Sequence, residues 1–276
     1  MNPITQTAFY CCGVRKEDAD RAQPICGDKF SGRFMDDRAH QFFAPFKTEV
    51  MSNLSCVTRH RIIDDLLRDA LEEDPYTQIV LLGCGFDSRP ARLTGGIWFE
   101  LDDEEILEHK DQRLPVSQCK NPLRRIAVDF TQESFIDKLP AFDPQHPLLV
   151  VIEGVLLYLD EAAQERMLSQ LLQLERSHQL ICDLMTRQFF EKYARSVQQK
   201  LSNIGASFDG VKDQPEGVFE QSGYTVMAST SINLRVYELG AYGSYTKLSN
   251  WLAWCVLKFL KPGLKEYAIV QLEYSA

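Results

Sequence analysis

The chain has 276 residues, enough for one large domain or for one domain with an added cap. Its content of 45% hydrophobic and 25% charged residues is that of an ordinary globular protein. The formal net charge of −9 argues against non-specific binding to nucleic acid or to an anionic membrane, because both require a basic surface.

Residues 1–73 are predicted to form a mainly helical N-terminal cap. The stretch "RHRIIDDLLRDALEED" (59–74) has apolar residues at the spacing of an amphipathic helix, and Asp74-Pro75 is expected to end it. The opening "MNPITQTAFYCCGVRKED" lacks a basic start followed by an apolar core, so no signal peptide is expected.

From residue 74 to the C-terminus we expect a second unit with an α/β fold. Strand-like runs alternate with helical runs there: strands at 78–83, 96–102, 123–129, 147–153 and 179–184, helices at about 104–113, 131–139 and 160–176. Such alternation is typical of a doubly wound parallel sheet. A sheet of this kind binds its ligand at the carboxyl ends of its strands, where the strand order reverses.

The last hundred residues are expected to complete the sheet. A long helix is predicted at about 187–203, a strand within 223–232 and a closing strand at 266–274. The segment between these two strands, about 233–264, is longer than a hairpin needs and is rich in aromatic residues, so we expect it to be an ordered insertion. Its aromatic side chains are candidates to enclose a small, partly apolar substrate: Tyr237, Tyr242, Tyr245, Trp251, Trp254 and Phe259. An ordinary helix packed on the sheet is the alternative.

The eight cysteines are scattered and show no zinc-binding spacing. No metal site is therefore predicted. Free thiols in apolar runs, such as those of Cys84 and Cys182, indicate a reducing, cytoplasmic compartment. The most apolar late stretch, "WLAWCVLKFL" (251–260), is far too short to span a bilayer.

Four consecutive predicted strands end in a glycine or in a polar or aromatic residue. Singly, each has an ordinary explanation, because a lone Gly-x-Gly is weak evidence and acidic residues after strands often cap helices. Together they predict a nucleoside site at the sheet edge. The residues are Gly83 and Gly85, then Glu100 and Asp102, then Asp129 and Phe130, and finally Glu153.

The segment "IVLLGCGFDSR" (79–89) narrows the choice of nucleoside. A dinucleotide fingerprint requires a third glycine where Ser88 stands, and Asp87 would repel a pyrophosphate. The Gly-Lys-Ser/Thr sequence of a phosphate-binding loop is absent. S-adenosylmethionine fits an acidic crevice better, because it offers a ribose, a sulfonium cation and a zwitterionic amino acid.

The chain resembles the leucine carboxyl methyltransferase family, which includes phosphatase-tail methyltransferases and bacterial polyketide-synthesis-type O-methyltransferases. The segments that carry the resemblance span residues 5–185: "VTRHRIIDDLL", "IVLLGCGFDSRPARL", "FELD", "AVDF" and "VIEGVLLYL". The C-terminal third matches only in outline, through "GVKDQPEGVFEQSGY". The resemblance implies a class I S-adenosylmethionine-dependent methyltransferase fold with a seven-stranded, mostly parallel sheet.

The resemblance also implies how each residue would bind the cofactor. Arg59, assisted by Arg15, would hold the carboxylate of the methionine portion, and Glu153 its ammonium group. Gly83 and Gly85 would face that portion. Asp102, with Glu100 behind it, would bind the ribose, whereas adenine would lie against Asp129 and Phe130. No counterpart of the region that grips a phosphatase tail is evident, so the acceptor stays open.

The predicted reaction is methyl transfer to an oxygen of a small-molecule carboxylate or hydroxyl. A carboxylate acceptor needs no base, whereas a hydroxyl acceptor does. Tyr158 is the aromatic residue nearest the expected reaction site, and five histidines are candidates by type alone: His40, His60, His109, His146 and His178. A carboxyl methyltransferase of a peptide tail and a catalytically silent S-adenosylmethionine-binding protein remain alternatives. A nicotinamide-dependent oxidoreductase is disfavoured by Ser88. The oligomeric state is not predicted.

Overall fold

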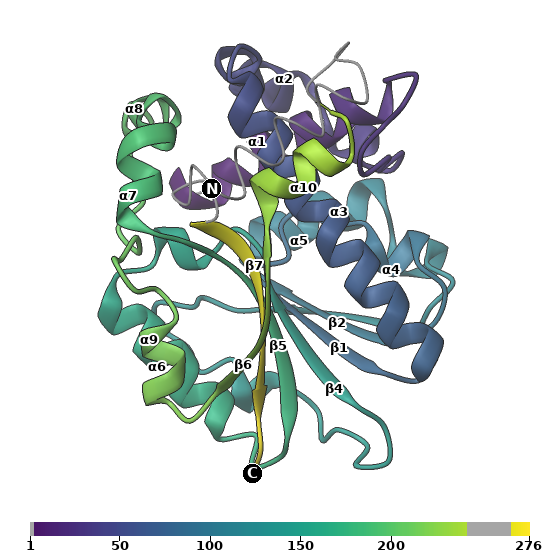
Figure 1. Ribbon diagram of the computed structural model, residues 1–276. Coiled ribbons are helices and arrows are strands. Elements are labelled where there is room, and N and C mark those ends of the chain that lie inside the picture. The colour runs from purple at the N-terminus through teal and green to yellow at the C-terminus, as the bar shows by residue number, and fades with distance from the viewer. Residues whose placement is uncertain (1–2, 242–265) are drawn as a thin grey trace.

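A computed structural model describes residues 3–241 and 266–276 and shows a single seven-stranded sheet with helices on both faces (Figure 1). The strands lie in the order β3-β2-β1-β4-β5-β7-β6, and β7 is antiparallel to both of its neighbours. Their bounds are β1 Gln78–Leu82, β2 Ile97–Asp102, β3 Leu123–Ala127, β4 Leu148–Ile152, β5 His178–Met185, β6 Thr225–Ser231 and β7 Tyr267–Tyr274. The predicted doubly wound sheet is therefore confirmed.

The strand order reverses beside β1, which pairs with β2 on one side and with β4 on the other. Every residue of β1 and β4 is buried, as expected for central strands covered on both faces. From β1 the chain adds β2 and β3 on one side of β1, and it then crosses to the other side of β1 to form β4. The carboxyl ends of β1 and β4 therefore mark the crevice where this topology binds ligands.

Of the three N-terminal helices, the first two lie at the end of the sheet where the parallel strands finish, and the third runs from there along one face of the sheet (Figure 1). They are α1 Pro3–Ala19, α2 Asp37–Phe43 and α3 Val50–Glu73, with short 3₁₀ turns at Ser31–Phe34 and Ala44–Phe46. Helix α3 ends directly before Asp74-Pro75, as predicted. Its apolar stripe, including Ile63 and Leu67, packs against Leu81 and Val151 on one face of the sheet.

The remaining helices include α4 Arg89–Arg92, α5 Glu104–Arg113, α6 Glu161–Leu172, α9 Gly217–Gln221 and α10 Ile232–Glu238. The helix predicted at 131–139 is wrong, because only a 3₁₀ turn, Ile136–Lys138, forms there. The carboxylate of Asp129 accepts hydrogen bonds from the backbone and hydroxyl of Thr131, and this local turn competes with a helix.

The helix predicted at 187–203 is split into three pieces: α7 Arg187–Phe189, a π-helical turn at Phe190–Ala194 and α8 Arg195–Ser202. Of the predicted insertion, residues 242–264 lie outside the described part of the chain, and with them all its singled-out aromatic residues except Tyr237 of α10. In the described ranges, no helix is both long and apolar enough to cross a membrane.

Candidate functional site

A cavity of about 200 Å³ lies at the carboxyl ends of the first four strands, and α1 and α3 contribute to its wall. All of the predicted site residues except Glu100 line this cavity: Arg15, Arg59, Gly83, Gly85, Asp102, Asp129, Phe130, Glu153 and Tyr158. Residues that lie far apart in the sequence thus meet at the crevice that the strand order creates.

The turn after β1 requires glycine. Gly83 and Gly85 both have a positive φ, of 68° and 46°. A Cβ atom on Gly83 would also overlap the side chain of Val155. The turn places the Gly85 N–H 2.6 Å from Oδ2 of Asp102, so the first and second strand ends are joined directly.

Asp102 is the carboxylate that stands at the end of β2. It accepts hydrogen bonds from the backbone N–H groups of Gly85 and Asp103, at 2.6 and 2.8 Å. Burial raises the pKa of Asp102 to about 6, and the two hydrogen bonds only partly oppose that shift. The group is therefore mostly ionised at pH 7 but takes up a proton in mildly acidic solution.

The prediction that Glu100 belongs to the site needs correction. Its side chain is fully buried and accepts from Nζ of Lys110 at 2.6 Å and from Nε of Arg125 at 2.8 Å. Residues two apart in a strand face the same side of the sheet, so Glu100 does lie behind Asp102. Both of its oxygens are engaged there, and it joins α5 and β3 to β2 instead of facing the cavity.

The third strand end supplies an exposed carboxylate and an aromatic face. Asp129 is solvent-exposed, and its Oδ1 accepts from the backbone and hydroxyl of Thr131, at 2.8 and 2.6 Å. Phe130 is half-buried, with its ring 6.2 Å from that of Phe135. Asp129 and Phe130 form an open rim of the cavity, and the ring of Phe130 offers an apolar surface against which a flat ring can pack.

Two buried arginines reach the cavity from the N-terminal helices, and each keeps one guanidinium nitrogen without an oxygen partner among the described residues. Arg15 binds Asp28 through Nε (3.1 Å) and the carbonyl of Phe86 through Nη2 (2.8 Å). Arg59 binds Glu153 through Nε (3.2 Å) and Asp183 through Nη1 (3.0 Å), whereas its Nη2 has only the Cys11 sulfur at 3.8 Å. The two free nitrogens suit an anionic group in the cavity.

Glu153, directly after β4, lies beside two buried arginines, Arg59 and Arg89, and the ring of His60. Oε2 lies 2.8 Å from Nη1 of Arg89 and 3.1 Å from Nδ1 of His60. Burial alone would raise the pKa of Glu153, but Arg89 and His60 hold it well below the ordinary value. The group is therefore an anion, and it already neutralises part of the arginine charge around it.

The sequence interpretation missed Arg89, the fully buried hub of this charge network. Its guanidinium contacts Asp64 at 2.6 Å, Asp87 at 2.6 Å and Glu153 at 2.8 Å. The sequence does show an arginine shortly after the glycine turn, and it shows acidic residues on the predicted helix that became α3. Without the fold, however, no spacing connects Arg89 with Asp64.

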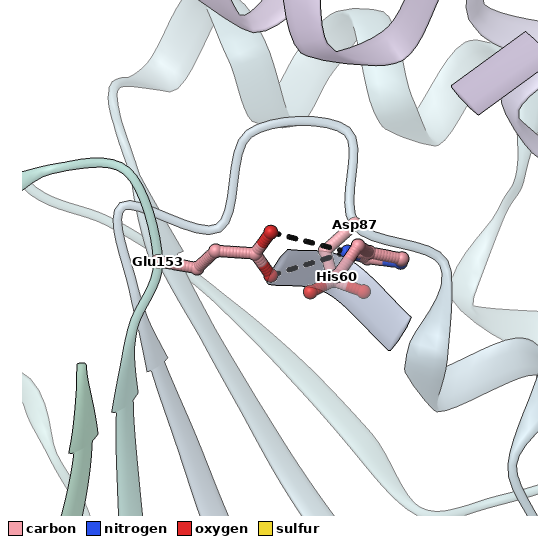
Figure 2. Close-up of side chains that lie close together, drawn as sticks. All are labelled: His60, Asp87 and Glu153. Atoms are coloured by element: carbon pink, nitrogen blue, oxygen red, sulfur yellow. Dashed lines mark hydrogen bonds and ion pairs between the residues drawn. The ribbon is translucent and has the colours of Figure 1, made fainter. Parts of the chain in front are cut away.

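His60, Asp87 and Glu153 converge as a cluster of metal-binding residue types (Figure 2). Their nearest ligand atoms lie within 4.8 Å of one another. The Arg89 guanidinium, however, is within 2.8 Å of both carboxylates, so it supplies the positive charge that a metal ion would bring. Nε2 of His60 lies 2.7 Å from Nη2 of Arg92, and Nδ1 lies 2.9 Å from Nη2 of Arg89 and 3.1 Å from Oε2 of Glu153, so both ring nitrogens are already engaged within the network. The cluster is an ion-pair network.

A second cavity, of about 270 Å³, adjoins the first. Four residues line both cavities and form the junction between them: Cys11, Arg59, Gly154 and Tyr158. Burial raises the pKa of Tyr158, so this phenol stays protonated at neutral pH. Of the five histidines, His60 alone lines either cavity.

Cys11 is the one thiol at the junction with a lowered pKa. A hydrogen bond from the thiol of Cys56 is the largest cause and, with Arg59 and Arg15, lowers the pKa of Cys11. We expect iodoacetamide to alkylate Cys11 with a pH midpoint below the ordinary value of 9.0, because the thiolate is the reactive form. Cys12 is the internal control, since burial raises its pKa to about 12. Peptide mass spectrometry measures both.

The variant Cys56→Ala removes the hydrogen-bond donor and should move the midpoint for Cys11 upward, toward the ordinary value of 9.0. A midpoint near 9 in the unaltered protein would contradict the assignment of a thiolate at the junction.

Residues 11–172 match the family model described as leucine carboxyl methyltransferase. A Frankia alni protein, named as a candidate S-adenosyl-L-methionine-dependent methyltransferase, is 36% identical over 184 residues, which cover 60% of this chain and 63% of that protein. The tetracenomycin polyketide synthesis O-methyltransferase TcmP of Streptomyces glaucescens is 25% identical over 175 residues, 62% of each chain. The chain thus spans less than two thirds of the length of these curated relatives.

A solved structure of a candidate methyltransferase from Thermobifida fusca is similar to this chain with a TM-score of 0.58 and 15% identity. The similarity covers 95% of this chain and 94% of the other. It confirms the predicted fold, the seven-stranded class I S-adenosylmethionine-dependent methyltransferase fold with a helical N-terminus.

Proposed function

Because the chain belongs to the leucine carboxyl methyltransferase family, we propose that it is an S-adenosylmethionine-dependent O-methyltransferase of a small-molecule carboxylate or hydroxyl. The family membership confirms the resemblance carried by the sequence motifs. The relative TcmP, named as an O-methyltransferase, supports oxygen as the acceptor atom.

The observation that carries the proposal is the arrangement of charge in the first cavity. S-adenosylmethionine has a carboxylate at one end, which the free nitrogens of Arg15 and Arg59 would hold. Glu153 would bind the ammonium group, and Asp102 would accept from the ribose hydroxyls. Adenine would lie against Phe130 beside Asp129. A dinucleotide fits less well, because Asp87 lines the cavity where a pyrophosphate would bind.

When bound, the cofactor supplies a methyl group already activated by its sulfonium. What remains for the protein is to align the acceptor oxygen with that group and to exclude water. The junction residues are placed for this task. Tyr158 would donate a hydrogen bond from its protonated phenol to the acceptor and orient it. For a hydroxyl acceptor, Cys11 would be the candidate base at the junction, because its pKa is lowered whereas Arg59 beside it keeps its proton.

The second cavity favours a small acceptor over a peptide tail, because it offers a concave, mainly apolar surface beside the cofactor site. The helices before residue 74 would form the cap over both ligands, since α1 and α3 line both cavities.

Calorimetry with S-adenosylhomocysteine tests the proposal. The protein should bind this product, with NAD and ATP weak or absent, and Asp102→Asn should weaken binding by about 1–3 kcal/mol through the loss of charge-assisted hydrogen bonds to the ribose. Asp137→Asn, an exposed carboxylate outside the cavity, is the control and should bind normally. Tight NAD binding without S-adenosylhomocysteine binding would rule the proposal out.

Asp102 also predicts how the affinity for S-adenosylhomocysteine depends on pH. The ionised form of Asp102 accepts from the ribose, and its pKa of about 6 in the free protein means that protons compete with the ligand below that pH. Affinity for S-adenosylhomocysteine should therefore fall as the pH is lowered from 7 to 5. Asp102→Asn should lack this fall, because it has no carboxylate to protonate.

A further inference from the structure

The second cavity has a lining unlike that of the first. Its walls are largely aromatic and aliphatic side chains from α3, β5, α7, the π-helical turn, α8 and the segment that follows α8, among them Phe189, Tyr193, Val197 and Phe208. Several of its polar side chains are already hydrogen-bonded: Ser55 donates to Asn233 at 3.3 Å and Tyr267 donates to Asp183 at 3.0 Å. Such a surface accepts flat apolar molecules and offers few hydrogen bonds to a sugar or a peptide backbone.

The charges on this lining have one sign. Among the described residues that line the cavity, Arg59 and Lys192 are cationic, and none is a carboxylate. Arg59 is compensated by Glu153 and Asp183. Lys192 is exposed, forms no ion pair with another described residue, and has its ammonium nitrogen 5.3 Å from the ring centroid of Tyr193. The cavity is therefore suited to a neutral or anionic guest and unsuited to a cation.

The backbone beneath Lys192 is irregular. Phe190–Ala194 forms a π-helical turn, a rare and weakly favoured geometry that recurs at functional sites. Three successive residues of this turn, Lys192, Tyr193 and Ala194, line the cavity. A regular α-helix spreads three successive residues over about 200° of its circumference and would not direct all of them to one side.

We propose that the second cavity is the acceptor site and takes an aromatic compound of one or two rings that carries an anionic group. The ring system lies among the aromatic side chains, the anionic group pairs with Lys192, and a separate oxygen at the junction is methylated. Lys192 lines only the second cavity, so it is a specificity residue and not part of the reacting centre. This inference rests on the proposed function.

The size of the cavity sets the number of rings. A cavity of about 150 Å³ in a protein core holds one benzene molecule. The 270 Å³ of this cavity therefore gives room for a guest of one or two rings.

The test uses 6-hydroxy-2-naphthoate and its neutral carboxamide, titrated into protein saturated with S-adenosylhomocysteine. The carboxylate should bind about two- to fivefold more tightly than the carboxamide, the size expected for an ion pair at an exposed lysine. Lys192→Gln should abolish this preference. Arg195→Gln removes a neighbouring exposed charge that lines neither cavity and should leave the preference intact.

A second variant tests the location. Ser52 is half-buried on the cavity wall, so Ser52→Trp should fill the volume and weaken both probes at least tenfold. Asp69→Trp, on an exposed position of the same helix, is the control. Affinity for S-adenosylhomocysteine should stay within twofold in all four variants.

The outcomes separate this inference from the proposed function. No binding of S-adenosylhomocysteine by the unaltered protein would overturn the proposed function itself. Normal binding of that product, together with no preference for the carboxylate, an unchanged preference in Lys192→Gln, or full probe affinity in Ser52→Trp, would overturn the acceptor assignment alone.

Discussion

Replacing Arg89 with methionine is expected to destabilise the folded protein by about 3–5 kcal/mol, the usual cost of removing one partner from a buried ion-pair network. Methionine approximates the length of the arginine stem but brings no charge. Asp64, Asp87 and Glu153 would then remain as carboxylates in the interior without the cation that lies within 2.8 Å of each. Urea denaturation at pH 7 measures the loss.

The size of the effect follows from burial. Arg89 and Asp64 are fully buried, so water cannot replace the missing interactions. Lys16→Met is the matched control: Lys16 is on α1, 38% exposed, and pairs with the exposed Asp20 at 2.7 Å. An exposed pair of this kind contributes at most about 1 kcal/mol. A loss of less than 1 kcal/mol in Arg89→Met would contradict the view that Arg89 organises the site.

The pH dependence of Arg89→Met distinguishes lost charge pairing from lost packing. In the unaltered protein, Arg89 helps to hold the pKa values of Asp87 and Glu153 below their ordinary values, so the stability it provides is present above about pH 4.5 and decreases as the pH falls below that. Without Arg89, burial favours protonation of these groups. The difference in stability between variant and unaltered protein should therefore narrow as the pH is lowered from 7 toward 4, whereas a packing defect would keep it constant.

The sequence was sufficient to predict the sheet and most of the first cavity. Apolar runs bounded by glycine or acidic residues identify central strands, and the doubly wound topology brings the ends of such strands together wherever the intervening helices lie. Asp102, Phe130 and Glu153 therefore line one cavity although they are many residues apart. Glu100 was misplaced because alternation along a strand predicts which face a side chain takes but not how deep it lies.

The charge partners and the second cavity depend on contacts that only the fold creates. Asp183, at the end of β5, accepts from Arg59 at 3.0 Å and from the backbone N–H of Gly154 at 2.6 Å. It follows the same strand-end pattern as Glu153 and was still missed. The second cavity combines side chains from helices and strands spread along the chain, and the π-helical turn that shapes it has no sequence signature.

Arg59 opens the stretch predicted as an amphipathic helix, where an arginine would ordinarily face solvent, but its environment is different. Its side chain is 8% exposed and bound to Glu153 and Asp183. A Cβ atom on Gly154 would come within 2.7 Å of Nη2, so the backbone that follows β4 leaves room for the guanidinium. Replacing Arg59 with an uncharged residue would leave Glu153 and Asp183 without this cation, and it would lower the stability of the fold as well as the affinity for the cofactor. A variant that keeps the positive charge therefore tests the binding role of Arg59 alone.

Arg59→Lys should weaken S-adenosylhomocysteine binding by about tenfold or more, because an ammonium group retains the charge but not the second, outward donor at Nη2. Binding of 5′-methylthioadenosine, which lacks the amino acid portion, should stay within about twofold. Asp102→Asn should instead weaken both ligands, since both contain the ribose. Arg61→Lys is the control, since Arg61 is on the same helix and lines neither cavity. Equal losses for the two ligands in Arg59→Lys would show that Arg59 supports the fold of the site and does not hold the cofactor carboxylate.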